Sequence, residues 1–142
     1  MSVRRFKTFL LAQPLVIMLI FSMSCDGIST KGPVSSCASS TAVIQVLDSG
    51  MKLICGCSEP GNLVYTHGAQ FTCTVSAGTT AEFIYSGIQQ PHSVSITGVI
   101  SFPERTPDSS NLNQVDAIPL NSSGHFTFSD AVTGTGGTFI VL

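Results

Sequence analysis

Short apolar segments separated by turn-forming residues are the feature that most limits the fold of this chain. From residue 41 onward these segments recur, and no stretch keeps an apolar period of 3.6 residues long enough for a helix. We expect seven strands, at residues 41–47, 51–55, 71–75, 80–85, 93–100, 125–129 and 138–142. Seven short strands in about 100 residues are typical of a β-sandwich. The sequence therefore predicts an all-β, antiparallel Greek-key sandwich over residues 41–142.

Alternation within the strands indicates which side chains face the core. Ala81, Phe83 and Tyr85 share one face of their strand, because successive side chains point to opposite sides. Phe126 and Phe128 repeat the pattern near the C-terminus. We expect these rings to lie between the two sheets.

The N-terminus has the pattern of an export signal. Arg4, Arg5 and Lys7 precede an apolar stretch from Phe9 to Met23. This stretch has about 15 residues, whereas a membrane-spanning helix needs roughly 20. Residues 1–24 are therefore predicted to be a cleavable signal peptide.

After this stretch come one small residue, Ser24, and then Cys25. This arrangement resembles a bacterial lipoprotein signal, in which the cysteine is lipidated, although Ser22 stands where leucine is preferred. The alternatives are an ordinary secretory signal with Cys25 as a plain thiol, and a twin-arginine signal. We expect Cys25 to be lipidated and the Ser-, Gly- and Thr-rich residues 25–40 to form a flexible tether. The chain would then be a cell-envelope protein, anchored to a membrane on the extracytoplasmic side.

Four further cysteines form an even set, which is what two disulfides require: Cys37, Cys55, Cys57 and Cys73. Disulfides persist outside the cytoplasm, and four cysteines allow three pairings. Cys55 and Cys57 are only two residues apart, so we expect each to bond outward to Cys37 or Cys73. Which goes to which stays open at this point.

The charge distribution excludes nucleic acid as a partner. Only 10% of the residues are charged, and downstream of Ser24 three cations stand against eight acidic residues, a net charge of −5. Three scattered cations cannot neutralise a run of phosphates.

A longer pattern appears from Phe71 to Ile96, FTCTVSAGTTAEFIYSGIQQPHSVSI. A strand ends at Val75, a turn follows at Ala77, and an alternating strand leads to a polar turn and to His92, which follows a proline. This segment resembles the cupredoxins, the blue-copper β-sandwich family of the plastocyanin and amicyanin type. The resemblance implies a cupredoxin-like sandwich in which His92 stands at the position of the first copper ligand.

The other ligands of that family come from one loop before the last strand, with the pattern Cys-x-x-His-x-x-Met. Counted back from the closing strand, Ser129, Val132 and Thr135 stand at those positions. A blue copper site needs a thiolate, which serine does not supply. We therefore expect a cupredoxin-like scaffold without an ordinary copper site and without another cofactor.

The sequence offers two alternative metal sites. His92 with His67, His125 or a thiol is an alternative copper site, and Cys55, Cys57, Cys73 and His67 form a loose zinc-like set. Strand alternation, however, points His125 outward. An exported domain with four cysteines favours disulfides over a thiolate cluster.

No catalytic motif is present: the sequence has no Gly-x-Ser-x-Gly elbow, and its glycine-rich segment at 134–137 precedes a strand. We expect a protein that is not an enzyme, with a binding or structural β-sandwich that meets an envelope or surface protein partner. The alternative function is copper binding or electron transfer around His92.

Overall fold

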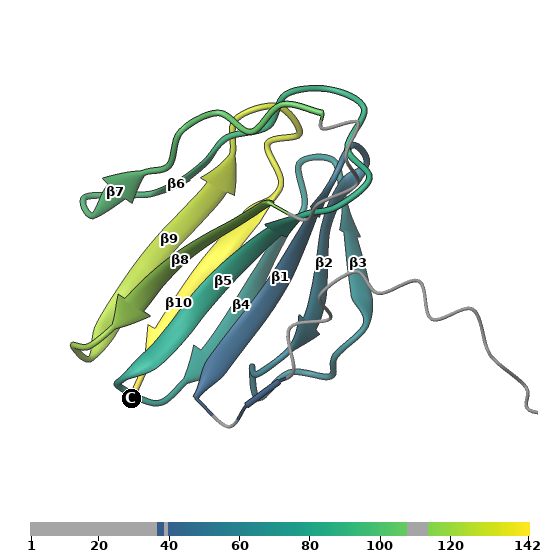
Figure 1. Ribbon diagram of the computed structural model, residues 1–142. Coiled ribbons are helices and arrows are strands. Elements are labelled where there is room, and N and C mark those ends of the chain that lie inside the picture. Colours follow the sequence, from purple (N-terminus) through teal and green to yellow (C-terminus); the bar gives the residue numbers. More distant parts are fainter. Residues whose placement is uncertain (1–36, 39, 108–113) are drawn as a thin grey trace, which may run out of the picture. The chain divides into compact units, whose positions relative to one another are not determined.

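A computed structural model describes residues 37–38, 40–107 and 114–142. The predicted signal peptide, Cys25 and nearly all of the predicted tether lie outside these residues. The described part contains strands and no helix, so it has no helix that is long and apolar enough to cross a membrane. The strands are β1 (Thr41–Leu47), β2 (Gly50–Cys55), β3 (Leu63–Thr66), β4 (Gln70–Val75), β5 (Thr79–Tyr85), β6 (Val94–Ile96), β7 (Ile100–Ser101), β8 (Gln114–Leu120), β9 (Gly124–Asp130) and β10 (Gly136–Val141) (Figure 1).

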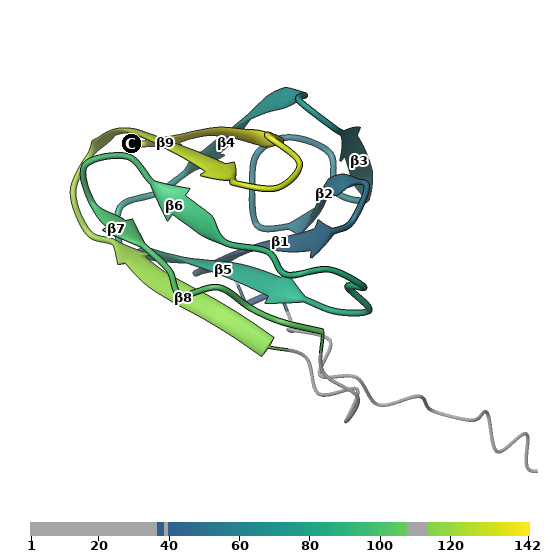
Figure 2. The same ribbon diagram turned by 90° about the horizontal axis from the view of Figure 1, so that it is seen from above.

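The strands form two sheets of five, with the orders β3-β2-β1-β5-β8 and β4-β10-β9-β6-β7. Seen from above, β1, β5 and β8 lie in one layer and β4, β6 and β9 in the other (Figure 2). Most neighbouring strands are antiparallel, but β1 pairs with β5, and β4 with β10, in parallel. The predicted all-β sandwich is confirmed, with one parallel pair added to each sheet.

All seven predicted strands are present, with ends shifted by at most two residues in six of them. The segment 93–100 instead divides into β6 and β7, because the chain turns at Gly98, whose φ of 74° suits glycine. β3 and β8 were not predicted. In β8 an acidic residue, Asp116, faces the core and interrupts the apolar alternation, and in β3 most side chains are exposed.

The core lies between the sheets and is centred on phenylalanine rings. Phe83, Phe128 and Phe139 are fully buried, and Phe128 contacts Phe139 with a centroid distance of 4.5 Å and Phe83 with 5.4 Å. Phe71 adds an edge contact to Phe128. The predicted core positions Ala81, Phe83, Tyr85 and Phe128 are buried, whereas Phe126 is only partly buried.

Two disulfides join Cys37 to Cys55 and Cys57 to Cys73, with Cα atoms 6.0 Å and 4.9 Å apart. The predicted outward bonding of the Cys55 and Cys57 pair is confirmed, and the structure selects one of the pairings that the sequence left open. All four of these sulfurs are therefore oxidised, which leaves no thiolate for the alternative zinc-like set. A group formed by Cys57, Glu59 and Cys73 has ligand atoms within 4.8 Å of one another, but its two sulfurs are bonded to each other.

Candidate functional site: a buried histidine between two aspartates

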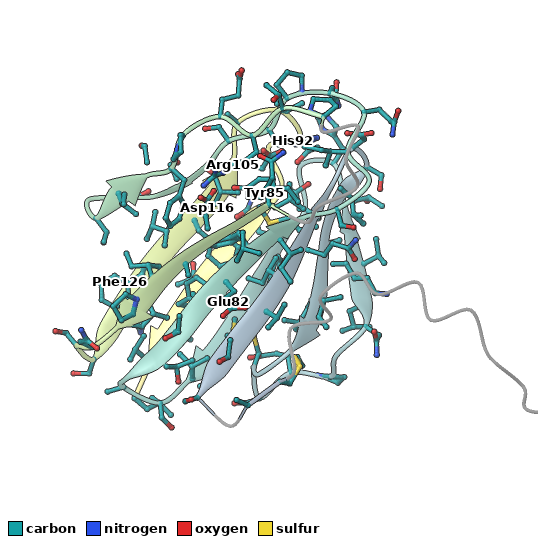
Figure 3. All side chains as sticks on the ribbon, in the orientation of Figure 1. Glu82, Tyr85, His92, Arg105, Asp116 and Phe126 are labelled. Atoms are coloured by element: carbon teal, nitrogen blue, oxygen red, sulfur yellow. A yellow bond between two sulfur atoms is a disulfide. The ribbon has the colours of Figure 1, made fainter. Side chains whose placement is uncertain are left out.

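One end of the sandwich gathers the polar groups of the interior. It is formed by the β1–β2 turn with Asp48, the segment before β6 with His92, and the β9–β10 loop at residues 131–135. Figure 3 shows His92 at this end with Arg105, Tyr85 and Asp116 nearby. We call His92, Asp130, Asp48 and Thr133 the His92 cluster.

His92 is fully buried and shares its inward face with Val94 and Ile96, as strand alternation predicted. Its Nδ1 lies 3.0 Å from Oδ2 of Asp130, and its Nε2 lies 3.0 Å from Oδ1 of Asp48. Each contact needs one proton between nitrogen and oxygen. Both ring nitrogens are therefore engaged by carboxylates, one on either side of the ring.

Asp130 is held as an acceptor by its surroundings. Its Oδ2 accepts hydrogen bonds from the backbone N–H of Thr133 at 2.9 Å and from the Thr133 hydroxyl at 2.8 Å, and its Oδ1 accepts one from the backbone N–H of Ser93 at 3.3 Å. Asp130 is the acceptor in all three of these hydrogen bonds, and its Oδ2 atom accepts both that come from Thr133. The proton between Asp130 and His92 therefore lies on Nδ1.

Asp48 closes the cluster from the solvent side, with its side chain 33% exposed. Partial burial acts to raise the pKa of this carboxyl, but hydrogen bonds from His92 and from the backbone N–H groups of Gln89 and Gln90 outweigh it, and the pKa lies below the ordinary value of 3.8. The Gln89 N–H donates to Oδ2 at 2.8 Å. This hydrogen bond ties the β1–β2 turn to the segment that carries His92.

A second polar group adjoins the first. His92 and Arg105 exchange backbone hydrogen bonds of 2.9 Å and 2.7 Å, and the Arg105 guanidinium pairs with the buried carboxylate of Asp116 on β8. Nε of Arg105 donates to both carboxylate oxygens, at 3.1 Å and 3.3 Å. This hydrogen bonding raises the pKa of Arg105 above its ordinary value, so the guanidinium stays charged.

The Tyr85 hydroxyl is buried beside this pair without a hydrogen bond of acceptable geometry. Burial is the main reason that the pKa of Tyr85 is raised, and the negative charge of nearby Asp116 adds to it. The phenol therefore stays neutral. An unpartnered hydroxyl at such a position costs stability.

The three histidines considered for a metal site do not come together. His67 is exposed in the turn between β3 and β4, next to the β9–β10 loop, where the N–H of Gly68 donates to the carbonyl of Thr133 at 3.0 Å. His125 is exposed at the start of β9, whereas Asp130, at the other end of that strand, contacts His92. The outward orientation predicted for His125 is thus correct, and it lies at the end of the sandwich opposite His92.

The sequence reasoning missed Asp130. It ended the strand at Ser129, whereas β9 continues through Asp130, which pairs with Val94 of β6. The inward alternation of Phe126 and Phe128 extends to Asp130, so a signal for its position was present. The family pattern placed a copper ligand at Ser129, but it is Asp130 that meets His92.

Comparisons with known proteins found similarity among solved structures alone. No protein-family model and no curated protein matches the sequence. Among solved structures, an oxidised amicyanin variant is 14% identical, with 76% of this chain and 88% of that chain covered and a TM-score of 0.49. A copper(I) form of another amicyanin variant is 16% identical, with coverages of 74% and 85% and a TM-score of 0.48. A purple cupredoxin from Nitrosopumilus maritimus is 14% identical, with coverages of 50% and 77% and a TM-score of 0.40.

These similar structures are cupredoxins, the family that the sequence resembles. At these identities, and with TM-scores below 0.5, the similarity transfers neither a family nor a function to this chain. The chemistry of the site has to be judged from its own residues.

The residues at this end do not fit an ordinary blue copper centre. Such a centre takes a thiolate and two imidazoles. All four cysteines in the described part of the chain are in disulfides, and Val132 and Thr133 of the β9–β10 loop offer no imidazole. The Nδ1 atom of His92 already donates to Asp130, so the only imidazole inside this cluster is used in a hydrogen bond.

Proposed function

We propose that this chain is an exported, membrane-anchored envelope protein whose β-sandwich serves as a non-catalytic binding or structural module. The observation that carries the proposal is the position of His92. Its ring is fully buried and both of its nitrogens contact carboxylates, so neither is offered to a metal or to a substrate. In place of copper ligands, this end of the sandwich contains a hydrogen-bonded cluster that fixes three loops.

The disulfides support an oxidising compartment. Two bonds formed by four cysteines persist outside the cytoplasm and are rare inside it. Cys37 bonds to Cys55, at the end of β2, whereas Asp48 precedes the start of that strand. A tether from a lipidated Cys25 would therefore join the sandwich at the end opposite His92, and the loops around His92 would be left free to meet an envelope or surface protein.

The first experiment is metal analysis by mass spectrometry on protein exported from copper-supplemented cells, together with a count of free thiols after denaturation. We expect less than 0.1 copper per chain and no free thiol among Cys37, Cys55, Cys57 and Cys73. The matched variant is His92→Ala, whose metal content should equal that of the wild type.

The second candidate function is copper binding or electron transfer around His92. It is favoured by the contact of His92 with the segment before the last strand, where the family resemblance places the remaining ligands. It predicts one copper per chain, a visible absorption band, and loss of both in His92→Ala. One copper per chain, or a visible absorption band, that is lost in His92→Ala would replace the binding-module proposal.

The anchor is tested separately. Metabolic labelling with a radioactive fatty acid should label the wild-type chain and not Cys25→Ser, and the variant should leave the membrane fraction. An unlabelled wild type that is secreted would support the ordinary secretory signal instead, and a labelled Cys25→Ser protein would mean that another residue is lipidated.

A further inference from the structure

The outward faces of the two sheets differ in composition. On the β4-β10-β9-β6-β7 sheet the outward positions include Thr72, Thr127, Thr138, Ser95 and Ser129, and adjacent hydroxyls of Thr127 and Thr138 lie 3.5 Å apart. Hydroxyl side chains of this kind are typical of a sheet face in contact with water. This face shows what a solvated surface looks like in this protein.

The outward face of the β3-β2-β1-β5-β8 sheet carries more apolar side chains than that of the other sheet. Register places Val43, Ile84, Val115, Ala117 and Val64 on it, because their neighbours along the strands face the core. Val43 and Ile84 are already buried, but Val64 and Val115, on the edge strands, are 53% and 40% exposed. The same register places Thr41, Gln45 and Thr80 among them, so this face mixes apolar and polar side chains, as protein interfaces do.

Two opposite charges stand on the same face without partners. Glu82 lies on β5 in the middle of the sheet (Figure 3), and Lys52 lies on β2. Neither belongs to an ion pair in the described residues, where the pairs are those of His92 and Arg105. Two strand spacings and one two-residue step separate them, about 12 Å, which is too far for a direct contact.

This arrangement is complementary to itself. A two-fold axis in the plane of the interface, crossing β1 between Val43 and Gln45 at right angles to the line from Glu82 to Lys52, would place Glu82 of each copy opposite Lys52 of the other. An interface between identical surfaces always forms such reciprocal contacts in pairs. The two charges that have no partner within one chain would thus both be paired in a dimer.

We propose that the outward face of the β3-β2-β1-β5-β8 sheet binds the same face of a second copy of this chain. The strand spacing and rise give a face of about 20 by 23 Å, so about 900–1,000 Å² would be covered in total, which is below the about 1,200 Å² of a stable interface and in the range of a weak, transient one. The chain's own segment 26–36 does not suit the apolar face, since Ile28 and Val34 are its only large aliphatic residues. The proposal does not depend on lipid anchoring or on the absence of copper.

The test is photo-crosslinking of the full-length chain in intact cells. A p-benzoyl-phenylalanine replaces Val115 on the apolar face or, as the control, Thr127 on the hydroxyl face. We expect a disulfide-independent dimer band from position 115 and at least tenfold less of it from position 127. Equal bands, no band, or a band only to a different protein would overturn the proposal, and the last result would assign the face to another partner.

Charge reversal makes the test specific to the two-fold arrangement. Glu82→Lys and Lys52→Glu should each reduce the dimer band at least fivefold, because like charges then face each other. The double variant should recover at least half of the wild-type band, and so should co-expression of the two single variants, which are complementary to each other. Glu104→Lys, an exposed charge at the His92 end, is the matched control and should have no effect.

Resistance to protease shows whether each variant is folded. If both single variants are folded and crosslink as well as the wild type, or if the double variant is folded and does not recover, the pairing of Glu82 with Lys52 is refuted.

Discussion

Removing the carboxylate of Asp130 should be among the most destabilising polar substitutions in this domain. In Asp130→Ala the buried His92 ring loses its partner at Nδ1 and keeps only Asp48 at Nε2, and the N–H and hydroxyl of Thr133 also lose their acceptor. Breaking a buried ion pair by removing one partner costs about 3–5 kcal/mol. We therefore expect the free energy of unfolding to fall by about that amount, a large part of the about 5–15 kcal/mol that a small domain has.

The assay is urea unfolding at pH 7 with the disulfides intact, followed by circular dichroism. Glu104→Ala removes an exposed carboxylate near the same end and should change the free energy of unfolding by less than about 0.5 kcal/mol. His92→Ala and the double variant complete a thermodynamic cycle. Because the two side chains are in contact, the double variant should be more stable than the sum of the single effects predicts, by about 1 kcal/mol or more.

The reasoning is refuted if Asp130→Ala costs less than about 1 kcal/mol, or if the two single effects simply add. Either result would mean that the His92 and Asp130 pair does not hold this end of the sandwich together.

Four further outcomes are expected. Phe128→Ala should lower the free energy of unfolding by about 3–5 kcal/mol in the same urea assay, because this fully buried ring packs against the rings at the centre of the core. Replacing both Cys57 and Cys73 by Ala should cost about 2–4 kcal/mol, since the bond between them closes a loop across 16 positions of sequence. Tyr85→Phe should leave the free energy of unfolding at pH 7 unchanged or raise it, because the hydroxyl has no hydrogen-bond partner. The stability of the wild type should fall as the pH rises above 10, because the phenol then ionises in the unfolded chain but not in the folded one, where its pKa is raised. The pKa of Asp48 is lowered on folding, so its contribution to the free energy of unfolding is present above the unfolded pKa of about 3.8 and is lost as the pH falls through the lower folded pKa. Asp48→Asn should therefore reduce the fall in stability measured between pH 5 and pH 2.

Local patterns in the sequence predicted most of the strands. Where an inward apolar side chain alternates with an outward polar one, as in β5 and β9, the burial of each residue follows from its position. β8 was not predicted because a charged residue at an inward position, Asp116, counts as evidence against a strand. The fold tolerates this charge because Arg105 pairs with it. β3 has four mostly exposed residues, so burial imposed no alternation on it.

The polar site was predicted only in its central residue. Alternation placed His92 inward, but its partners lie 38 and 44 positions away along the chain, at the end of β9 and in the β1–β2 turn, and their approach depends on how the sheets pack. The end of β9 was set one residue short, and this error exchanged Ser129 for Asp130 as the residue opposite His92.

The sequence by itself determined the all-β class, the inward face of His92 and the even set of four cysteines, because these depend on alternation and on residue counts. Only the tertiary structure decided the disulfide pairing and the two carboxylates on His92, since both depend on which loops meet at the ends of the sandwich. It also decided that the outward apolar residues gather on one sheet and the outward hydroxyl residues on the other. Alternation assigns the residues of each strand to two faces, but only the order of the strands in the sheets decides which outward residues lie side by side.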